Sequence, residues 1–356
     1  MLKLEIKSRT GPYSAFFGQE FDFVRSLAAM PNAAYVIDAN VQRLYSKQLS
    51  AIPQEAIISF EATEENKSLD GANLIYDKMI ERAAKRNSTL VAIGGGITQD
   101  VAGFAASTLY RGIDWCFVPT TLLAQADSCI GGKTSLNYKQ YKNLLGTFCP
   151  PKSIFIETSF VKTLSDLDFH SGMGEVVKLH LIDAKSEADL DAIGGLARIR
   201  KDDSKKIGLI VQKSLRIKAE FIQEDEFDKG RRNLLNYGHC FGHALETASD
   251  YRVPHGIGVM AGILFAAIAS KKRGSITAAR FGQIAECVRP NITLNTSDLH
   301  LDGETRILEA MKKDKKRVGS GLSLVLPRQN FKVEKVDDFT AEEFSAAIAE
   351  LRALLK

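Results

Sequence analysis

Residues 88–96 read Ser-Thr-Leu-Val-Ala-Ile-Gly-Gly-Gly, and this stretch indicates the fold class. The apolar run predicts a short buried strand, and an apolar, helix-like segment that begins at Asp100 follows the glycines. Glycines let the backbone approach a ligand closely, and free N–H groups at a helix start favour phosphate. The spacing is not the Gly-x-Gly-x-x-Gly fingerprint, so the stretch predicts either a nucleotide site or merely a tight turn.

Similar short apolar runs lie on both sides of this stretch. They cover residues 34–37, 56–58, 116–118 and 154–156, and several helix-like segments separate them. Such alternation is typical of an α/β layer with a largely parallel sheet. Residues 1–6 also alternate like a strand.

The pattern changes to longer helical stretches after residue 158. These stretches, together with one late strand, cover residues 205–223, 233–249, 256–273, 275–288, 321–327 (the strand) and 340–355. We therefore expect two domains, an N-terminal Rossmann-like α/β domain over 1–160 and a mainly helical metal-binding domain over 161–356.

Composition excludes several classes of protein. The chain has 356 residues, of which 45% are hydrophobic and 25% charged, so disordered and fibrous classes do not apply. The net charge of +4 is small and spread out, which does not indicate nucleic-acid binding. We expect a cytoplasmic protein, because no run approaches the roughly 18 apolar residues that span a membrane. The five scattered cysteines include no Cys-x-x-Cys pair, so they suggest neither disulfides nor a thiolate zinc site.

A candidate metal site comes from three segments of the second half. His239 and His243 are four residues apart, which places both on one helix face. With a carboxylate upstream at Glu175 and a third imidazole downstream at His255, they form a plausible oxygen and nitrogen site for zinc. His-x-x-x-His alone is weak evidence, and the neighbouring segments strengthen it.

Blocks of sequence along most of the chain carry a family resemblance. They are Gly94-Gly95-Gly96, Asp100, Gly103-Phe104, Tyr110-Arg111-Gly112, Pro119-Thr120-Thr121-Leu122-Leu123-Ala124-Gln125, Asp127-Ser128, Gly131-Gly132-Lys133-Thr134, Lys142-Asn143, Glu175-Val176-Val177-Lys178, Asn236-Tyr237-Gly238-His239, Gly242-His243-Ala244, His255-Gly256 and Asp314-Lys315-Lys316. In this order they resemble the dehydroquinate synthase family of sugar phosphate cyclases. The blocks at 119–125 and 131–134 are especially specific.

The resemblance implies a two-domain enzyme, expected to be a homodimer, that binds NAD and a divalent metal, usually zinc with cobalt possible. It implies conversion of 3-deoxy-D-arabino-heptulosonate 7-phosphate (DAHP) to 3-dehydroquinate, with transient oxidation by NAD, phosphate elimination, reduction and aldol cyclisation. The implied metal ligands are Glu175, His239 and His255, which leave room for substrate oxygens.

The resemblance also implies roles for other residues. The catalytic set is His243 as an acid/base group with Lys133, Lys178, Lys218, Arg232 and Asn236. The substrate set is Arg111, Asp127, Lys142, Asn143, Asp228 and one of Lys315 or Lys316. The cofactor set is Asp38, Asn40, Glu64, Lys67, Gly95, Gly96, Asp100, Thr120, Thr121 and Asp127. Arg232 stands four residues before Asn236, which predicts a shared helix face, and would pair with the substrate carboxylate.

Several positions depart from the family pattern. They are Gln99 in place of glycine, Ser165 in place of proline, Leu179-His180 in place of an aromatic and glycine, and Ile257 after Gly256. A cyclase acting on sedoheptulose 7-phosphate is therefore an alternative, although Arg232 argues against it. An iron-containing alcohol dehydrogenase and a non-catalytic binding protein of the same fold are further alternatives.

Overall fold

The computed structural model describes residues 2–139, 141–313 and 321–356, and the chain forms two compact units. The first contains Met1–Thr163 and Ser204–Phe227, and the second contains Leu164–Asp203 and Asp228–Lys356. The expectation of one boundary near residue 160 therefore needs correction for residues 204–227. This segment holds helix α7 (Ser204–Glu224), whose apolar face packs on Ala124–Ser128 and Thr158–Thr163 of the first unit.

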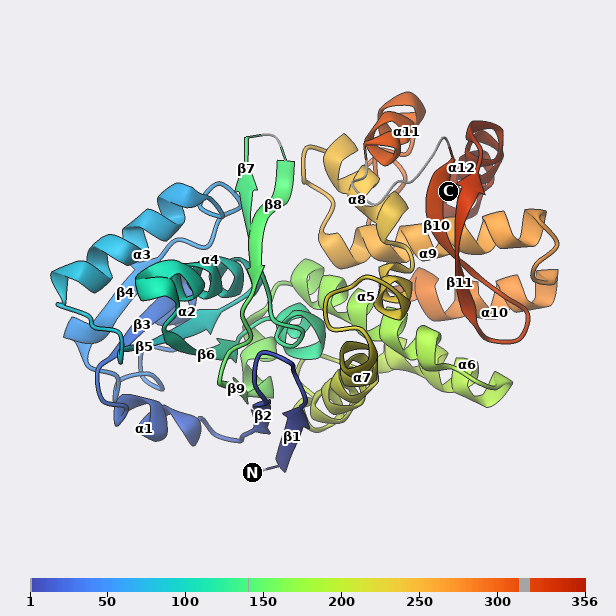
Figure 1. The fold of residues 1–356 in the computed structure, drawn as a ribbon. Coiled ribbons are helices and arrows are strands. Elements are labelled where there is room, and N and C mark those ends of the chain that lie inside the picture. The colour runs from blue at the N-terminus through green and yellow to red at the C-terminus, as the bar shows by residue number, and fades with distance from the viewer. Residues whose placement is uncertain (1, 140, 314–320) are drawn as a thin grey trace. The chain divides into compact units, whose positions relative to one another are not determined.

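A mainly parallel sheet forms the first unit, as predicted (Figure 1). In spatial order its described strands are β1 (Leu2–Ile6), β2 (Tyr13–Phe17), β9 (Ser153–Ile156), β6 (Asp114–Pro119), β5 (Thr89–Gly94), β3 (Ala33–Asp38) and β4 (Ile57–Phe60). Only the β1–β2 pair is antiparallel among them. Strands β3, β5 and β6 are buried along nearly their whole length, which explains their continuous apolar runs.

Helices and a separate hairpin complete the first unit. They are α1 (Phe23–Ala28), α2 (Ala39–Leu44), α3 (Leu69–Glu81), α4 (Gly96–Thr108), β7 (Lys133–Tyr138) and β8 (Tyr141–Phe148). The hairpin packs on α4, where a Cβ on Gly103 would lie only 2.7 Å from Thr134 Cγ2. The sequence predicted neither hairpin strand, because β8 is exposed along much of its length and has little apolar pattern.

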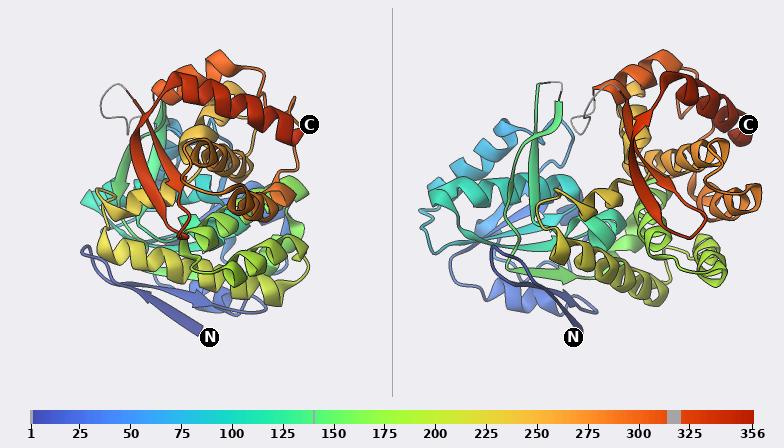
Figure 2. Two further views of the ribbon diagram at one scale, coloured as in Figure 1. Left: turned by 90° about the vertical axis from the view of Figure 1, so that its right-hand side faces the viewer. Right: turned by 45° about the vertical axis from the view of Figure 1, so that its right-hand side comes forward.

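The second unit is mainly helical, as predicted. Its described elements are α5 (Asp166–Asp183), α6 (Glu187–Gly194), α8 (His239–Ala248), α9 (His255–Lys272), α10 (Ala278–Val288), α11 (Glu304–Lys312), β10 (Leu322–Pro327), β11 (Val333–Phe339) and α12 (Ala341–Leu355). Helix α9 is the centre of this unit, since α5, α8, α10, α12 and β10 all contact it (Figure 2). Residues 256–270 of α9 are buried without exception.

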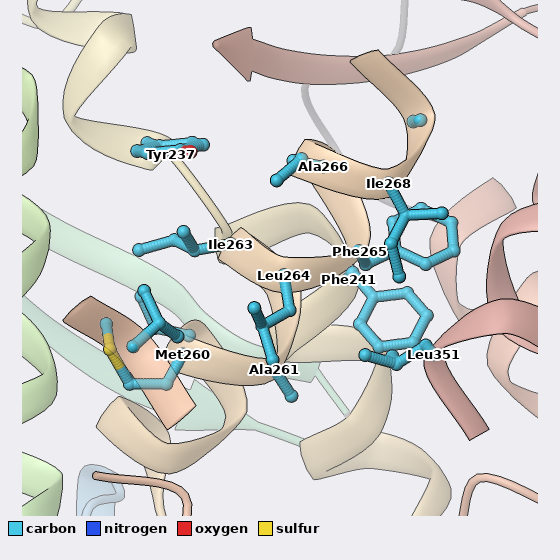
Figure 3. Close-up of a cluster of buried hydrophobic side chains, with 14 of the residues drawn as sticks. Tyr237, Phe241, Met260, Ala261, Ile263, Leu264, Phe265, Ala266, Ile268 and Leu351 are labelled. Carbon is cyan, nitrogen blue, oxygen red and sulfur yellow. The ribbon is translucent and has the colours of Figure 1, made fainter. Parts of the chain in front are cut away.

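An apolar cluster around α9 holds these helices together. Phe241 of α8 stacks on Phe265 of α9 with ring centroids 4.1 Å apart, and Leu351 of α12 lies beside them (Figure 3). Burial of such side chains stabilises a core by about 1.5–3 kcal/mol each. The departure Ile257 belongs to this cluster, which explains an apolar residue there.

Short turns connect the longer elements. The 3₁₀ turns described are Gln54–Ala56, Leu109–Arg111, Thr158–Thr163, Gly195–Arg198, Arg231–Asn236 and Arg289–Asn291, and Ala124–Ser128 is a π-helical turn. The helix predicted over 233–249 is therefore wrong in its first part, because Gly238 at φ 79° separates the turn at 231–236 from α8. A 3₁₀ turn has about 3 residues per turn, so residues three apart share a face and residues four apart do not. The shared face predicted for Arg232 and Asn236 is therefore also wrong.

Two further departures have simple structural reasons. Ser165 caps α5, since its Oγ accepts a hydrogen bond from the Asp168 amide at 3.1 Å. Leu179 is fully buried within the same helix. None of the described helices combines the length and apolarity needed to cross a membrane.

Candidate active site

Three helices of the second unit carry the predicted metal ligands. Glu175 lies in the middle of α5, whereas His239 and His255 are the first residues of α8 and α9. Glycines beside the ligands let the backbones approach closely. A Cβ on Gly174 would lie 2.4 Å from the carbonyl oxygen of Gly256, so neither α5 nor α9 could keep this position with a larger residue.

The donor atoms of these three residues have the spacing of a metal site. Glu175 Oε1 lies 3.3 Å from His255 Nε2 and 3.7 Å from His239 Nε2. Two ligand atoms of a tetrahedral zinc ion are roughly 3.3–3.6 Å apart, given bond lengths of about 2.0–2.2 Å. A carboxylate oxygen and two imidazole nitrogens therefore fit a divalent ion, which supports the predicted ligand set.

His243 lies near this set but is more exposed. Its ring centroid is 5.3 Å from that of His239 and 5.6 Å from that of His255. One nitrogen from each of the three imidazoles falls within 4.8 Å of the others, so an all-histidine site is a second possible grouping. We favour Glu175 over His243 as a ligand, because the Glu175 distances are closer to those of a tetrahedral site. The predicted acid/base role of His243 stays a prediction.

Buried charges surround the candidate ligands. Lys178, one turn after Glu175 on α5, contacts the second oxygen of that carboxylate, and the two side chains are 2% and 0% exposed. Burial, together with the Lys178 charge, lowers the pKa of His239 well below its usual value. A neutral imidazole is the form that binds a metal ion. Lys178 thus favours both the ionised carboxylate and the neutral ring.

Sequence reasoning missed one acidic residue, Glu246. Its Oε1 lies 2.7 Å from Nδ1 of His255. Burial alone would lower the pKa of His255, but the Glu246 charge and the hydrogen bonds to Glu175 and Glu246 raise it to about 10. Glu246 stands seven residues after His239, two helical turns along the same face, so helical periodicity could have found it.

The remaining predicted residues of the second unit lie in and before the turn at 231–236. Arg232 is 3% exposed, whereas Asn236 is half-buried and donates from Nδ2 to the Asn233 carbonyl at 2.9 Å. Asp228 has a φ of 57°, and its carbonyl accepts from Asn233 Nδ2 at 3.1 Å. Lys315 and Lys316 lie outside the described residues.

A polar cluster in the first unit brings together predicted cofactor and phosphate residues. Lys67 Nζ lies 2.5 Å from Asp100 Oδ2 and donates to Asn143 Oδ1 at 2.7 Å. Ser135 Oγ donates to the same Asp100 oxygen at 3.0 Å. Burial raises the pKa of Asp100, although the Lys67 charge opposes this.

Glu64 and Lys142 extend this cluster. Lys142 Nζ lies 3.1 Å from Glu64 Oε1, which also accepts from Asn137 Nδ2 at 2.9 Å. Burial alone would raise the pKa of Glu64, but the Lys142 charge and the Asn137 hydrogen bond lower it. Asn137 and Ser135 were not predicted. They lie two residues apart on β7, so the alternation of that strand would have identified them, had the strand been recognised.

The glycine turn after β5 is packed against the end of β6. A Cβ on Gly95 would lie 3.0 Å from Thr121 Cγ2, and Gly96 begins α4. The amide of Thr120 donates to the Gly94 carbonyl at 2.9 Å, and Thr121 Oγ1 accepts from the Ala124 amide at 3.2 Å. The turn and both predicted threonines thus lie together at the carboxyl ends of neighbouring strands.

Asp38 ends β3 and caps α2. Its Oδ1 accepts from the amides of Asn40 at 2.8 Å and Val41 at 3.3 Å. Burial raises the pKa of Asp38, and these two amides oppose the shift. The Asn40 side chain is exposed, and its Oδ1 accepts from Arg43.

Helix α7 brings Lys218 to the π-helical turn of the first unit. Lys218 Nζ lies 2.7 Å from Asp127 Oδ1 and donates to the Asp127 carbonyl at 2.6 Å. Single π turns inside helices occur frequently at functional sites. Arg111 and Lys133 are both exposed, the first in a turn at φ 66° and the second at the start of β7.

Comparison with known proteins identifies similar chains. The model of the 3-dehydroquinate synthase N-terminal domain matches residues 57–171, and that of the C-terminal domain matches residues 172–317. A 3-dehydroquinate synthase of Alkaliphilus metalliredigens is 34% identical, with 94% of this chain and 95% of that protein covered. The enzyme of the same name from Picosynechococcus is 38% identical, with 81% of this chain and 79% of that protein covered.

Solved structures share the fold. A 2-deoxy-scyllo-inosose synthase complexed with carbaglucose-6-phosphate, NAD+ and Co2+ has a TM-score of 0.84 at 24% identity, covering 98% of this chain and 99% of the other. A 2-epi-5-epi-valiolone synthase from Streptomyces hygroscopicus, with NAD+ and Zn2+ bound, has a TM-score of 0.81, the same identity and the same coverage. An iron-containing alcohol dehydrogenase is more distant, with a TM-score of 0.64 at 15% identity, covering 96% and 98%.

Proposed function

Because the chain belongs to the 3-dehydroquinate synthase family, we propose that it converts DAHP to 3-dehydroquinate with release of phosphate, as a carbon–oxygen lyase. The observation that carries the proposal is the Glu175, His239 and His255 donor set, whose spacing fits a divalent ion. A degenerate, non-catalytic member of the family would be expected to lose such ligands.

The two cofactors would be held by different units. Residues Glu175, His239 and His255 would hold the metal ion, which we propose is zinc. Residues of the glycine turn and of the Lys67–Asp100 cluster would hold NAD. When bound, the metal ion lowers the pKa of a coordinated alcohol, and NAD accepts and later returns a hydride.

The residues around the metal ligands would manage charge and protons. His243 is exposed and within one helical turn of His239, so its imidazole can take a proton from the substrate and return it. Lys178 is buried against Glu175, where its fixed positive charge would stabilise negative charge that develops on the substrate. Arg232 would bind the substrate carboxylate through its planar, bidentate guanidinium.

Phosphate is the leaving group, and it must be held as a dianion. Arg111, Lys133, Lys142 and Asn143 supply cationic and amide donors for this purpose. Lys142 and Asn143 already belong to the polar cluster around Lys67, whereas the side chains of Arg111 and Lys133 are exposed and could turn toward a ligand.

We propose NAD as the cofactor in preference to NADP. The Asp38 carboxylate at the end of β3 would accept hydrogen bonds from the adenine ribose and repel an added phosphate. Titration of the purified protein with each dinucleotide should show much tighter binding of NAD. Equal binding of NADP would exclude this role of Asp38.

Phosphate release by the metal-loaded protein with NAD tests the reaction. DAHP and sedoheptulose 7-phosphate are offered in parallel, products are identified by mass, and His239→Ala is the negative control. We expect release from DAHP with a 3-dehydroquinate product. Release only from sedoheptulose 7-phosphate would contradict the assigned substrate, and net NADH formation with a simple alcohol would instead indicate a dehydrogenase.

A further inference from the structure

Glu246 makes a specific contact with one predicted metal ligand. Its side chain is 10% exposed, and its Oε1 lies 2.7 Å from Nδ1 of His255. The opposite ring nitrogen, Nε2, faces Glu175 Oε1 at 3.3 Å. His255 is thus held between two carboxylates, one at each ring nitrogen.

This arrangement selects one tautomer of His255. A carboxylate accepts a hydrogen bond, so the Nδ1 atom next to Glu246 keeps its proton when a metal ion takes the place of the proton on Nε2. The lone pair is then on Nε2, the atom that points toward Glu175 and the predicted ion position. We propose that Glu246 is a positioning residue for the metal site, which fixes the tautomer and ring orientation of His255.

The contact of α8 with α9 is apolar, with Phe241 stacked on Phe265 at 4.1 Å and an interplanar angle of 12°. Burying a carboxylate in such surroundings costs free energy unless the group is well paired. The hydrogen bond with His255 Nδ1 is such a pairing, and outer carboxylates of this kind typically change metal affinity about 10–100-fold.

The proposal rests on the proposed function only in that His255 binds an ion, so the test uses metal binding without NAD or sugar phosphate. Metal-free wild type, Glu246→Gln and Glu246→Ala are titrated with Co2+ in competition with a chelator, and the absorption spectrum of bound Co2+ is recorded. Glu246→Ala should lose affinity by about 10–100-fold and change the spectrum. Glu246→Gln, which keeps an acceptor for Nδ1–H without the charge, should lose less.

Glu286→Gln is the matched control, because Glu286 is an exposed glutamate on α10 of the same unit. It should bind Co2+ like wild type. If Glu246→Ala does not fold, the loss of Co2+ affinity in Glu246→Gln is the measurement that tests the proposal. Co2+ affinity within about twofold of wild type in the folded variants, with an unchanged spectrum, would overturn the proposal. Wild type that binds Co2+ but releases no phosphate from DAHP would contradict the proposed function and leave this inference standing.

Discussion

Gln99 and Ser128 form two reciprocal hydrogen bonds, with Gln99 Nε2 donating to the Ser128 carbonyl and Ser128 Oγ donating to Gln99 Oε1, each at 2.7 Å. Gln99 is one of the expected departures from the family pattern, and its side chain connects the first turn of α4 to the π-helical turn that holds Asp127. This departure therefore makes a structural contact between α4 and that turn.

Replacing Gln99 by alanine should weaken this connection. The variant loses two hydrogen bonds and leaves the partly buried Ser128 carbonyl without the Gln99 donor, so the free energy of unfolding should fall by about 1–3 kcal/mol. Urea denaturation measures the change, and Gln48→Ala, at an exposed position, is the control. Equal stability of Gln99→Ala and wild type would show that the contact contributes nothing.

Tyr237→Phe should stabilise the protein. Among the described residues the buried hydroxyl of Tyr237 has no hydrogen-bond partner, so its removal relieves a desolvation cost of about 1 kcal/mol. Tyr35→Phe is the matched comparison and should destabilise by a similar amount, because the equally buried Tyr35 hydroxyl donates to the Leu27 carbonyl at 2.5 Å. Thermal unfolding of both variants tests the opposite signs, and a loss of stability in Tyr237→Phe would contradict the first.

His239→Ala should remove one of three proposed metal ligands. We expect loss of bound zinc and of phosphate release, with the fold retained. Metal content after gel filtration and far-UV circular dichroism measure these outcomes. His300→Ala, which changes a half-buried histidine outside the cluster, should keep its metal. Stoichiometric zinc in His239→Ala would refute the ligand assignment.

Two neighbouring arginines allow a matched test of carboxylate recognition. Arg232 is buried, whereas Arg231 is exposed. Arg232→Ala should lower kcat/KM for DAHP by about 10–100-fold, since a hydrogen bond to a charged group contributes about 1.5–3 kcal/mol. Arg231→Ala should have little effect. Unchanged turnover of DAHP by Arg232→Ala would exclude the carboxylate role.

An ion pair in the second unit should make stability depend on pH. Arg273 Nε and Nη2 donate to the two oxygens of Glu343 at 2.6 and 2.7 Å, and these bonds hold the pKa of Glu343 below its usual value, although burial opposes them. The ionised form therefore stabilises the fold above the unfolded pKa of about 4.3, and this contribution disappears as the pH falls through the lower folded pKa.

Glu343→Gln should remove this dependence. It should be less stable than wild type at about pH 6, by roughly 1 kcal/mol for a partly exposed pair, and the difference should shrink toward about pH 3. Glutamine can still cap α12 beside Thr340. Urea denaturation at several pH values measures the difference, and a difference that grows as the pH falls would contradict the sign.

The sequence was sufficient for those elements whose local pattern matches their environment. The central strands β3, β5 and β6 are buried on both faces, so they appear as continuous apolar runs, and α7 has one apolar face. The His239 and His243 spacing likewise predicted one helix face, which α8 confirms. Helix α5 was missed because its buried residues include the polar Glu175, Lys178 and His180, which interrupt any apolar face.

Contacts between distant segments required the tertiary structure. Sequence alone placed three metal-binding residue types in the chain, but only the close approach of α5 and α9 at Gly174 and Gly256 brings a carboxylate oxygen to 3.3 Å from an imidazole nitrogen. The tertiary structure also shows that α7 belongs to the first unit and that Glu246 contacts His255. Local patterns report the burial of each residue, whereas the partner of a buried charge depends on how separate helices pack.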